Sequence, residues 1–133
     1  MATKILDAFA LLAFFQDEPG AEIVENLIHA AEQGIVKLAI CVVNVGEIWY
    51  SISRKTSPER ADHFIQEIQG TAIEIVDPDW SLTRQAAIYK AKGNISYADC
   101  FAAALAKARD AVVVTGDGEF KVLASEVKIE WLE

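Results

Sequence analysis

Four acidic residues stand where a carboxylate could take part in chemistry. Asp7 directly follows a short apolar segment, and Asp117 lies in the turn "TGDGEF" that follows the apolar run "AVVV". Glu47 and Asp99 each lie within the first turn of a predicted helix. If the apolar segments are parallel strands, their carboxyl ends meet at one edge of a sheet, where ligands of such sheets bind. We therefore expect the four carboxylates to gather at that edge.

Carboxylates crowded together repel one another unless a cation or a proton lies between them. Hard oxygen ligands without an accompanying Cys or His pair favour Mg²⁺ or Mn²⁺ over Zn²⁺. Such an ion can orient a phosphodiester, acidify an attacking water and stabilise the leaving oxygen, while a carboxylate free of the ion takes a proton from the water. The pattern predicts metal-assisted phosphodiester chemistry.

Each acid taken alone also has a structural explanation. Asp7 could cap the helix that follows it, and Asp117 could be an ordinary turn residue. Asn44 with Glu47, and Ser96 with Asp99, have the spacing of a capping box, in which the acid closes the start of the helix. The occurrence of all four together favours a site.

The elements that must position these acids alternate between strands and helices. Several of the strands are apolar throughout, which is typical of a parallel sheet covered on both faces. The fold predicted is a three-layer α/β/α sandwich with a central, mainly parallel sheet, formed by a single domain over residues 1–133. The expected strands are 3–6, 36–43, 71–77, 111–116 and 127–132, and the expected helices are 8–16, 21–33, 44–55, 57–69, 77–93 and 96–110.

Composition excludes several classes of protein. Hydrophobic residues make up 53% of the chain, which supports a packed core and argues against disorder. No apolar stretch is long enough to span a membrane, and the start of the chain lacks the pattern of a secretory signal. We expect a cytoplasmic protein with Cys41 and Cys100 as reduced core residues. The net charge of −8 gives no overall basic surface for nucleic acid.

Four segments, in this order, resemble the PIN-domain family: "KILDAFALLAFF", "VNVGEIWY", "SYADCFAAALA" and "VVVTGDGEF". The length and the ending "VTGDGEF…KIEWL" are similar to VapC-type toxins of prokaryotic toxin–antitoxin pairs. The resemblance implies a Mg²⁺- or Mn²⁺-dependent endoribonuclease whose metal-binding and catalytic residues are Asp7, Glu47, Asp99 and Asp117. It also implies a nearby hydroxyl from Thr115, an auxiliary acid at Glu119, a homodimer, and inhibition by a small antitoxin whose tail lies across the site.

The sequence departs from that family pattern directly after Asp7. Family members usually carry one or two hydroxyl or amide residues there, whereas this chain has Ala8 and Phe9. Loss of a hydrogen bond that orients a ligating carboxylate weakens metal binding. The alternative hypothesis is therefore a degenerate PIN module that binds a partner or RNA without cleaving it. A third hypothesis, an acid-pocket receiver or phosphatase, is disfavoured because a phosphatase of that kind would need a second Asp where Phe9 stands.

An acidic RNA-cleaving site needs cations around its rim. Arg54 and Lys55 at the end of one helix, and Lys90 and Lys92 just before the Asp99 helix, are the candidates for contacts with RNA. All four could instead be helix C-terminal cations favoured by the helix dipole. The acidity of the chain also suits a basic antitoxin tail.

Overall fold

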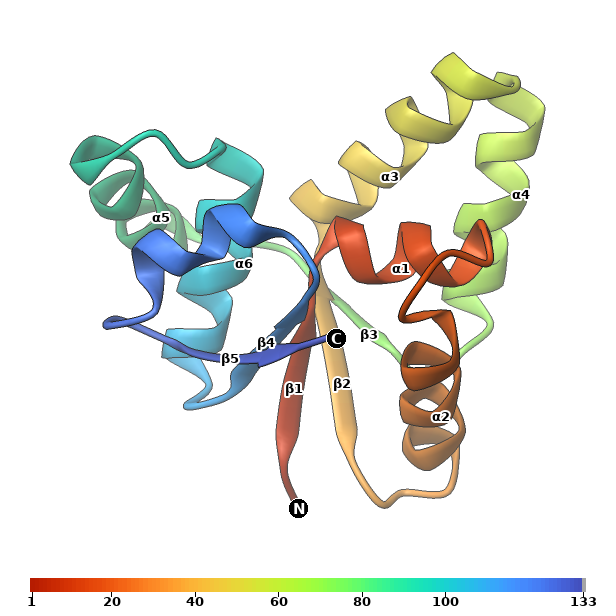
Figure 1. Cartoon of the computed structure of the whole chain (residues 1–133), viewed down its shortest axis with the longest axis horizontal. Helices are drawn as coiled ribbons and strands as arrows, with labels where there is room; N and C mark the ends of the chain where they lie inside the picture. The colour runs from red at the N-terminus through yellow and green to blue at the C-terminus, as the bar shows by residue number, and fades with distance from the viewer. Residues whose placement is uncertain (133) are drawn as a thin grey trace.

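Five parallel strands form the centre of the molecule in the computed structural model, which describes residues 1–132 (Figure 1). The sheet has the order β3-β2-β1-β4-β5, and every pair of neighbouring strands is parallel. The elements run in the order β1 (Thr3–Leu6), α1 (Ala8–Phe15), α2 (Ala21–Glu32), β2 (Lys37–Cys41), α3 (Val42–Lys55), α4 (Pro58–Gln69), β3 (Glu74–Val76), α5 (Trp80–Lys92), α6 (Tyr97–Ala108), β4 (Val112–Thr115), the 3₁₀ helix η1 (Gly118–Leu123) and β5 (Lys128–Trp131).

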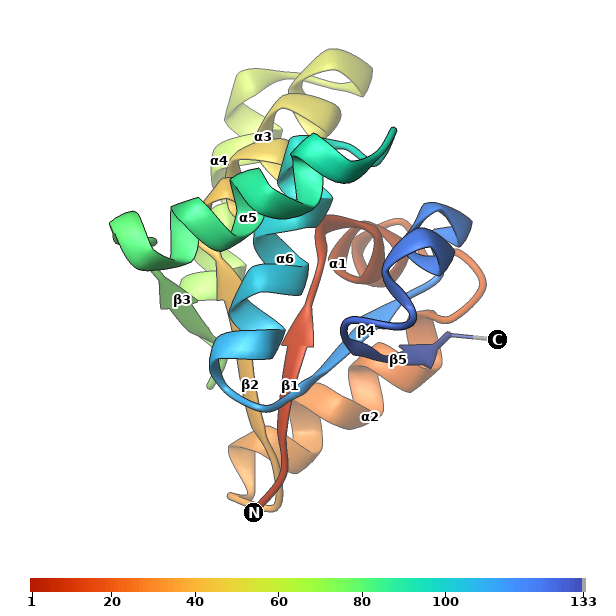
Figure 2. The ribbon, with the colours of Figure 1, turned by 90° about the vertical axis from the view of Figure 1, so that its left-hand side faces the viewer.

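Helices cover both faces of the sheet, which confirms the predicted three-layer arrangement. Helices α5 and α6 lie on one face, and α1 and α2 lie on the other together with α3 and α4 (Figure 2). Side chains alternate between the two cores along each strand: Ile5 packs toward α6, and its neighbour Leu6 packs toward α1. Burial on both sides explains the continuous apolar runs at residues 38–41 of β2 and 112–114 of β4.

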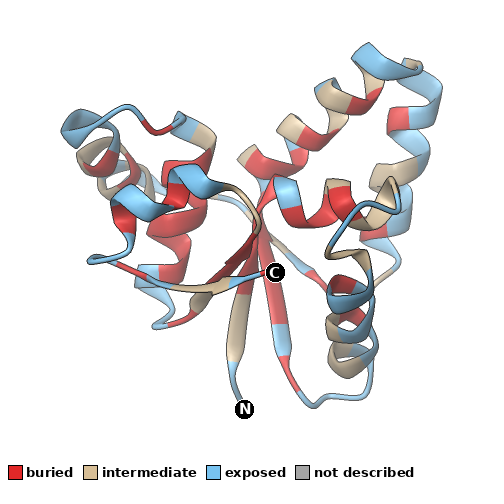
Figure 3. Ribbon diagram, in the orientation of Figure 1, coloured by how far each residue is buried: buried red, intermediate tan, exposed pale blue. Residues whose placement is uncertain are grey.

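The most deeply buried helix is α6, whose residues from Asp99 to Ala106 are all buried (Figure 3). Its alanines allow close approach to the sheet, and the Oγ of Ser96 accepts a hydrogen bond from the N–H of Asp99 at 3.2 Å. This cap fixes the start of the helix at the upper edge of the sheet in Figure 1, beside the ends of β1 and β4. Helix α6 thus places Asp99 near the other predicted acids.

The structure corrects the predicted boundary between the second strand and its helix. Val42 and Val43 were expected to be in a strand over residues 36–43, but α3 already begins at Val42 and its N-cap is Cys41, not Asn44. The pairing explains this, because Cys41 is the register partner of Val76, the last residue of β3. Because β3 ends there, Val42 and Val43 have no strand partner on that side, and their β-branched side chains alone do not keep them in a strand.

The other differences are small. Strands β3, β4 and β5 are shorter than predicted by one to a few residues at their ends, and η1 was not predicted. Within residues 1–132, no helix has the length and apolar character needed to cross a membrane.

Candidate functional site

The predicted acids converge where the strand order reverses. Along the chain the sheet grows from β1 to β2 and β3 on one side and then to β4 and β5 on the other, so that β1 and β4 are central neighbours. Asp7 directly follows β1, and Asp117 follows β4 with only Gly116 between. In open parallel sheets this reversal point opens a crevice outside the carboxyl ends of the strands, which is the usual place for a ligand.

Asp7 is completely buried and is held from two directions. Its Oδ1 accepts a hydrogen bond from the N–H of Ala10 at 2.9 Å, which makes it the N-cap of α1. Its Oδ2 accepts a hydrogen bond from the hydroxyl of Thr115 at 2.5 Å. The pKa of Asp7 is raised to about 7, mainly by burial and less by repulsion from Asp99 and Asp117, although both hydrogen bonds act in the opposite direction. The cap predicted for Asp7 is confirmed, and it does not remove the carboxylate from the group.

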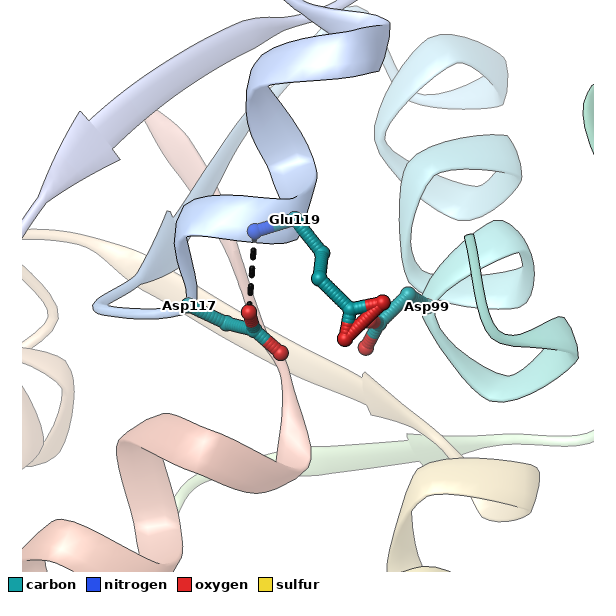
Figure 4. Close-up of side chains that lie close together, drawn as sticks. All are labelled: Asp99, Asp117 and Glu119. Carbon is teal, nitrogen blue, oxygen red and sulfur yellow. Dashed lines mark hydrogen bonds between the residues drawn. The ribbon is translucent and has the colours of Figure 1, made fainter. Parts of the chain in front are cut away.

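Thr115 connects the two central strand ends. While its hydroxyl donates to Asp7, its Oγ1 accepts a hydrogen bond from the N–H of Asp117 at 2.9 Å. Oδ1 of Asp117 in turn accepts from the N–H of Glu119 at 2.9 Å, at the start of η1 (Figure 4). The turn role expected for Asp117 is therefore real, and it uses one carboxylate oxygen while orienting the rest of the group.

Asp99, Asp117 and Glu119 come closest together. Each offers a carboxylate oxygen, and these three oxygens lie within 4.8 Å of one another (Figure 4). The pKa of Asp99 is raised to about 7, mainly by burial, then by the neighbouring charge of Asp117 and less by Glu47 and Glu119, while Ser96 acts in the opposite direction. None of the Lys or Arg ion pairs formed within residues 1–132 involves these carboxylates.

Glu47 faces this trio from α3. It lies one turn further along the helix than predicted, because the helix begins at Val42. Its Oε1 is buried and has no hydrogen-bond partner in the described part of the chain. Burial raises the pKa of Glu47, and the charges of Asp117 and Glu119 raise it further. A buried carboxylate oxygen without a donor is energetically costly, and a proton or a cation would relieve that cost.

Asn44 does not cap α3 but connects two helices. Its side chain is fully buried, and its Nδ2 donates a hydrogen bond to the carbonyl oxygen of Ala98 at 3.0 Å. Ala98 directly precedes Asp99, so this contact ties the start of α3 to the first turn of α6. The spacing of Asn44 in the sequence did not indicate this role, although a polar residue inside an apolar segment was an available signal.

The five acids of this edge, Asp7, Glu47, Asp99, Asp117 and Glu119, suit a hard divalent cation. They offer only oxygen ligands, and the pKa values of Asp7 and Asp99 are raised to about 7. The buried Oε1 of Glu47 has no hydrogen-bond partner within the described residues. Mg²⁺ and Mn²⁺ prefer such ligands, and a cation would offset the repulsion that contributes to the raised pKa values. The donor set therefore fits the predicted metal, with Glu119 closer to the centre than expected for an auxiliary residue.

The four basic residues predicted at the rim have different environments. The guanidinium of Arg54 lies over the ring of Tyr50, 5.0 Å from its centroid, and Lys55 is exposed beside it at the end of α3. The Nζ of Lys90 donates to the carbonyl oxygen of Ile95 at 2.9 Å. Lys92 forms an ion pair with Glu126 at 3.3 Å. Both lysines are thus engaged within the chain, and contact with RNA would require them to leave these partners.

Comparison with known proteins agrees with this geometry. The sequence model of the PIN domain matches residues 4–126. Among solved structures, DNA-bound VapBC from Salmonella typhimurium is similar over 100% of both chains, with 19% identity and a TM-score of 0.76. VapBC2 from Rickettsia felis, bound to a DNA fragment from its promoter, has 19% identity and a TM-score of 0.71 over 96% of this chain and 97% of that chain.

A third structure is VapC20 from Mycobacterium tuberculosis, described as a sarcin-ricin loop cleaving toxin. It has 14% identity and a TM-score of 0.73 over 93% of this chain and 95% of that chain. At these identities the likeness shows a shared fold. No curated protein sequence matches this chain significantly.

Proposed function

Since this chain belongs to the PIN domain family, we propose that it is a Mg²⁺- or Mn²⁺-dependent endoribonuclease and the toxin of a VapC-type toxin–antitoxin pair. The observation that carries the proposal is the convergence of five carboxylates at the reversal point of the sheet, none of which takes part in a Lys or Arg ion pair within residues 1–132. Such a group is unfavourable for stability in the absence of a cation, and it stands where ligands of parallel sheets bind.

Asp99, Asp117 and Glu119 would hold the cation, because their oxygens already lie within 4.8 Å of one another. Glu47 and Asp7 complete the predicted ligand and catalytic set from α3 and the end of β1. When bound, a divalent cation would acidify a water and offset negative charge on the phosphodiester oxygens. A carboxylate of the group that does not hold the cation accepts the proton of the attacking water.

The remaining contacts keep these carboxylates in place. The hydroxyl of Thr115 orients Asp7, and the N–H of Glu119 orients Asp117. The contact between Asn44 and Ala98 holds α3 against α6, so that Glu47 and Asp99 keep their separation. Orientation of metal ligands by such contacts typically changes metal affinity or activity roughly 10- to 100-fold.

The degenerate binding module rests on two observations, the absence of polar residues at positions 8 and 9, after Asp7, and the low basic content of the chain. The contacts of Asp7 weaken the first of them. Both oxygens of Asp7 nevertheless accept hydrogen bonds, one from the backbone of α1 and one from Thr115 on β4. The orienting group is thus supplied from another strand.

The proposed partners are an RNA substrate, a small cognate antitoxin and a second copy of this chain. The similar solved structures from S. typhimurium and R. felis are VapBC complexes, which supports an antitoxin partner. A basic antitoxin tail would meet the complementary charge of the acidic edge. Arg54 and Lys55 remain the predicted RNA contacts, together with Lys90 and Lys92 if these exchange their present partners.

The test is cleavage of end-labelled single-stranded RNA with Mg²⁺, Mn²⁺ or EDTA. Asp99→Asn is expected to abolish metal-dependent cleavage, and Asp110→Asn is a matched control because it removes the same charge just beyond the other end of α6. Asp110 has a φ of 49°, a conformation that Asn also adopts. Equal cleavage by wild type and Asp99→Asn would refute the site. Absence of cleavage by a wild-type protein that binds metal would refute the nuclease and favour the binding module.

A further inference from the structure

A pocket of about 470 Å³ adjoins the acidic edge and plays no part in the chemistry described so far. Gly116 and Gly118, which flank Asp117 in sequence, both line it. The pocket is therefore continuous with the loop that carries a proposed metal ligand. Its remaining walls come from α1, the loop after α1, η1 and the end of β5, and they include Phe9, Glu18, Lys121 and Trp131.

The aromatic walls of the pocket are exposed to solvent. Phe9 is 41% exposed and Trp131 38% exposed, although both are large hydrophobic residues. The ring of Phe9 lies directly on the backbone of Gly116, since a Cβ placed on this glycine would lie 2.3 Å from Cε1 of Phe9. One side of the Phe9 ring is thereby packed against the glycine loop. An aromatic surface at the rim of a pocket is suited to stacking.

Two opposite charges divide the pocket. Lys121, on η1, supplies a cation three residues beyond Gly118, and Glu18 supplies a carboxylate from the loop after α1. A phosphate is attracted by the lysine and repelled by the glutamate. A base amino group can donate a hydrogen bond to a carboxylate, as cytosine N4 does to Glu or Asp.

We infer that this pocket binds one unpaired nucleobase next to the phosphodiester that is cleaved. The base stacks on the aromatic side chains, an adjacent phosphate contacts Lys121, and Glu18 favours a base with an exocyclic amino group over uracil. The inference rests on the proposed ribonuclease function. It is supported by the loop of Gly116 and Gly118, which lines the pocket and carries Asp117 between its two glycines, because a strand whose phosphate lies at Asp117 would place a neighbouring base near this loop.

The test measures RNA binding in the Asp99→Asn background with Mg²⁺, so that the RNA is not cut. The anisotropy of short labelled oligoribonucleotides made of adenine, uracil or abasic nucleotides is followed for the parent protein and for Phe9→Ala, Phe9→Leu and Lys121→Ala. Val122→Ala is the control, because Val122 is a 64% exposed neighbour on η1 that does not line the pocket. Thermal unfolding of every variant checks that it folds.

The expected result is that Phe9→Ala and Phe9→Leu weaken binding of the adenine oligomer roughly tenfold, as loss of one stacked base predicts. Both should leave binding of the abasic oligomer unchanged, and the uracil oligomer should bind less tightly than the adenine oligomer. Lys121→Ala should weaken binding of the adenine, uracil and abasic oligomers alike. Val122→Ala should not weaken the binding of any of them. Equal binding of adenine and abasic oligomers, or no effect of the Phe9 variants, would overturn the inference.

The same experiment separates this inference from the proposed function. If the wild-type protein does not cut RNA but binding of the adenine oligomer depends on Phe9, the base-binding pocket stands and the nuclease function is refuted. RNA cleavage by wild type and Phe9→Ala at equal rates would keep the nuclease and refute the pocket. The peptide Lys-Phe-Lys is tested in place of RNA as a probe for a protein partner. If it binds the parent protein and Phe9→Ala abolishes this binding, the pocket belongs to a protein partner and the inference is wrong.

Discussion

Thr115 donates a hydrogen bond of 2.5 Å to Oδ2 of Asp7, although 108 positions separate the two residues in the chain. The same hydroxyl oxygen accepts the N–H of Asp117 at 2.9 Å. One side chain therefore joins the ends of β1 and β4, which are neighbours in the sheet. It provides the polar contact that Ala8 and Phe9 cannot, and it makes the position of one proposed ligand depend on another.

Replacement of Thr115 tests this connection. Thr115→Val removes both hydrogen bonds while keeping the shape, and it leaves a buried carboxylate oxygen and a backbone N–H with one partner fewer. We expect a loss of stability of about 1–3 kcal/mol and a roughly 10- to 100-fold increase in the Mg²⁺ concentration needed for cleavage. Thr115→Ser keeps the hydroxyl and should stay close to wild type. Chemical denaturation and Mg²⁺ titration of the cleavage rate are the measurements, and equal effects of Val and Ser would contradict the role of the hydroxyl.

Metal binding should raise the unfolding temperature through the carboxylate group. An ion that binds only the folded protein stabilises it according to its affinity and concentration. Addition of Mg²⁺ or Mn²⁺ to EDTA-treated protein is expected to raise the Tm of wild type and of the control Asp110→Asn. The rise should be lost or strongly reduced in Asp117→Asn. A rise of the same size in Asp117→Asn would mean that Asp117 is a turn residue and not a ligand.

Without metal, the stability of the protein should fall as the pH rises through neutrality. Burial raises the folded-state pKa of Asp7 and Asp99 to about 7, above their ordinary value of 3.8. Between these values the folded state binds more protons than the unfolded state, so the free energy of unfolding decreases with increasing pH. In EDTA, we therefore expect a higher Tm near pH 5 than near pH 8.

Two controls accompany that pH series. Asp99→Asn removes one of the two titrating groups and should give a weaker dependence on pH, with a higher metal-free Tm near pH 8 than wild type. Saturating Mg²⁺ should reduce the decrease in Tm between pH 5 and pH 8, because a cation favours the ionised carboxylates. A metal-free Tm that increased from pH 5 to pH 8 would contradict the raised pKa values.

Asn44 is expected to act on cleavage through the position of Asp99. Asn44→Ala removes the donor to the carbonyl oxygen of Ala98, which should lower stability by about 1–3 kcal/mol and reduce the cleavage rate. Asn44→Asp should lower the Tm further in EDTA, because it places a carboxylate against a carbonyl oxygen and adds a charge near the acidic edge. Denaturation and cleavage assays on both variants measure this. Cleavage at the wild-type rate by Asn44→Ala would show that the contact serves stability alone.

Gly116 should accept a side chain only if the ring of Phe9 moves away from it. Gly116→Ala places a Cβ 2.3 Å from the ring and should lower the Tm, whereas Gly118→Ala meets nothing within 4 Å and should have little effect. The double variant Phe9→Ala with Gly116→Ala should recover most of the loss, because the clash is removed. Thermal unfolding of wild type, Phe9→Ala, Gly116→Ala and the double variant forms a double-mutant cycle. Additive effects of the two substitutions would show that the ring does not rest on the glycine.

The sequence alone determined the elements and the positions of the acids along them. Alternating apolar strands and capped helices predicted a parallel sheet between two helical layers, and the structure confirms it. The caps at Asp7 and Ser96 were also predicted, because a cap depends on a few neighbouring residues. These are local properties, and each acid could be placed at a strand end or a helix start without knowledge of the rest of the chain.

Only the tertiary structure decided which acids meet. The reversal of strand order between β1 and β4 makes Asp7 and Asp117 neighbours, and it depends on how distant segments pack. The spacing of Asn44 and Glu47 fits a capping box, yet the pairing of β2 with β3 ends at Cys41 and starts the helix earlier. That shift turns Asn44 toward α6 and leaves Glu47 outside the trio of Asp99, Asp117 and Glu119. Glu119 joins this trio from the 3₁₀ helix η1, which no periodicity in the sequence indicated. Local spacing cannot encode such contacts, because they follow from burial and strand pairing across the whole sheet.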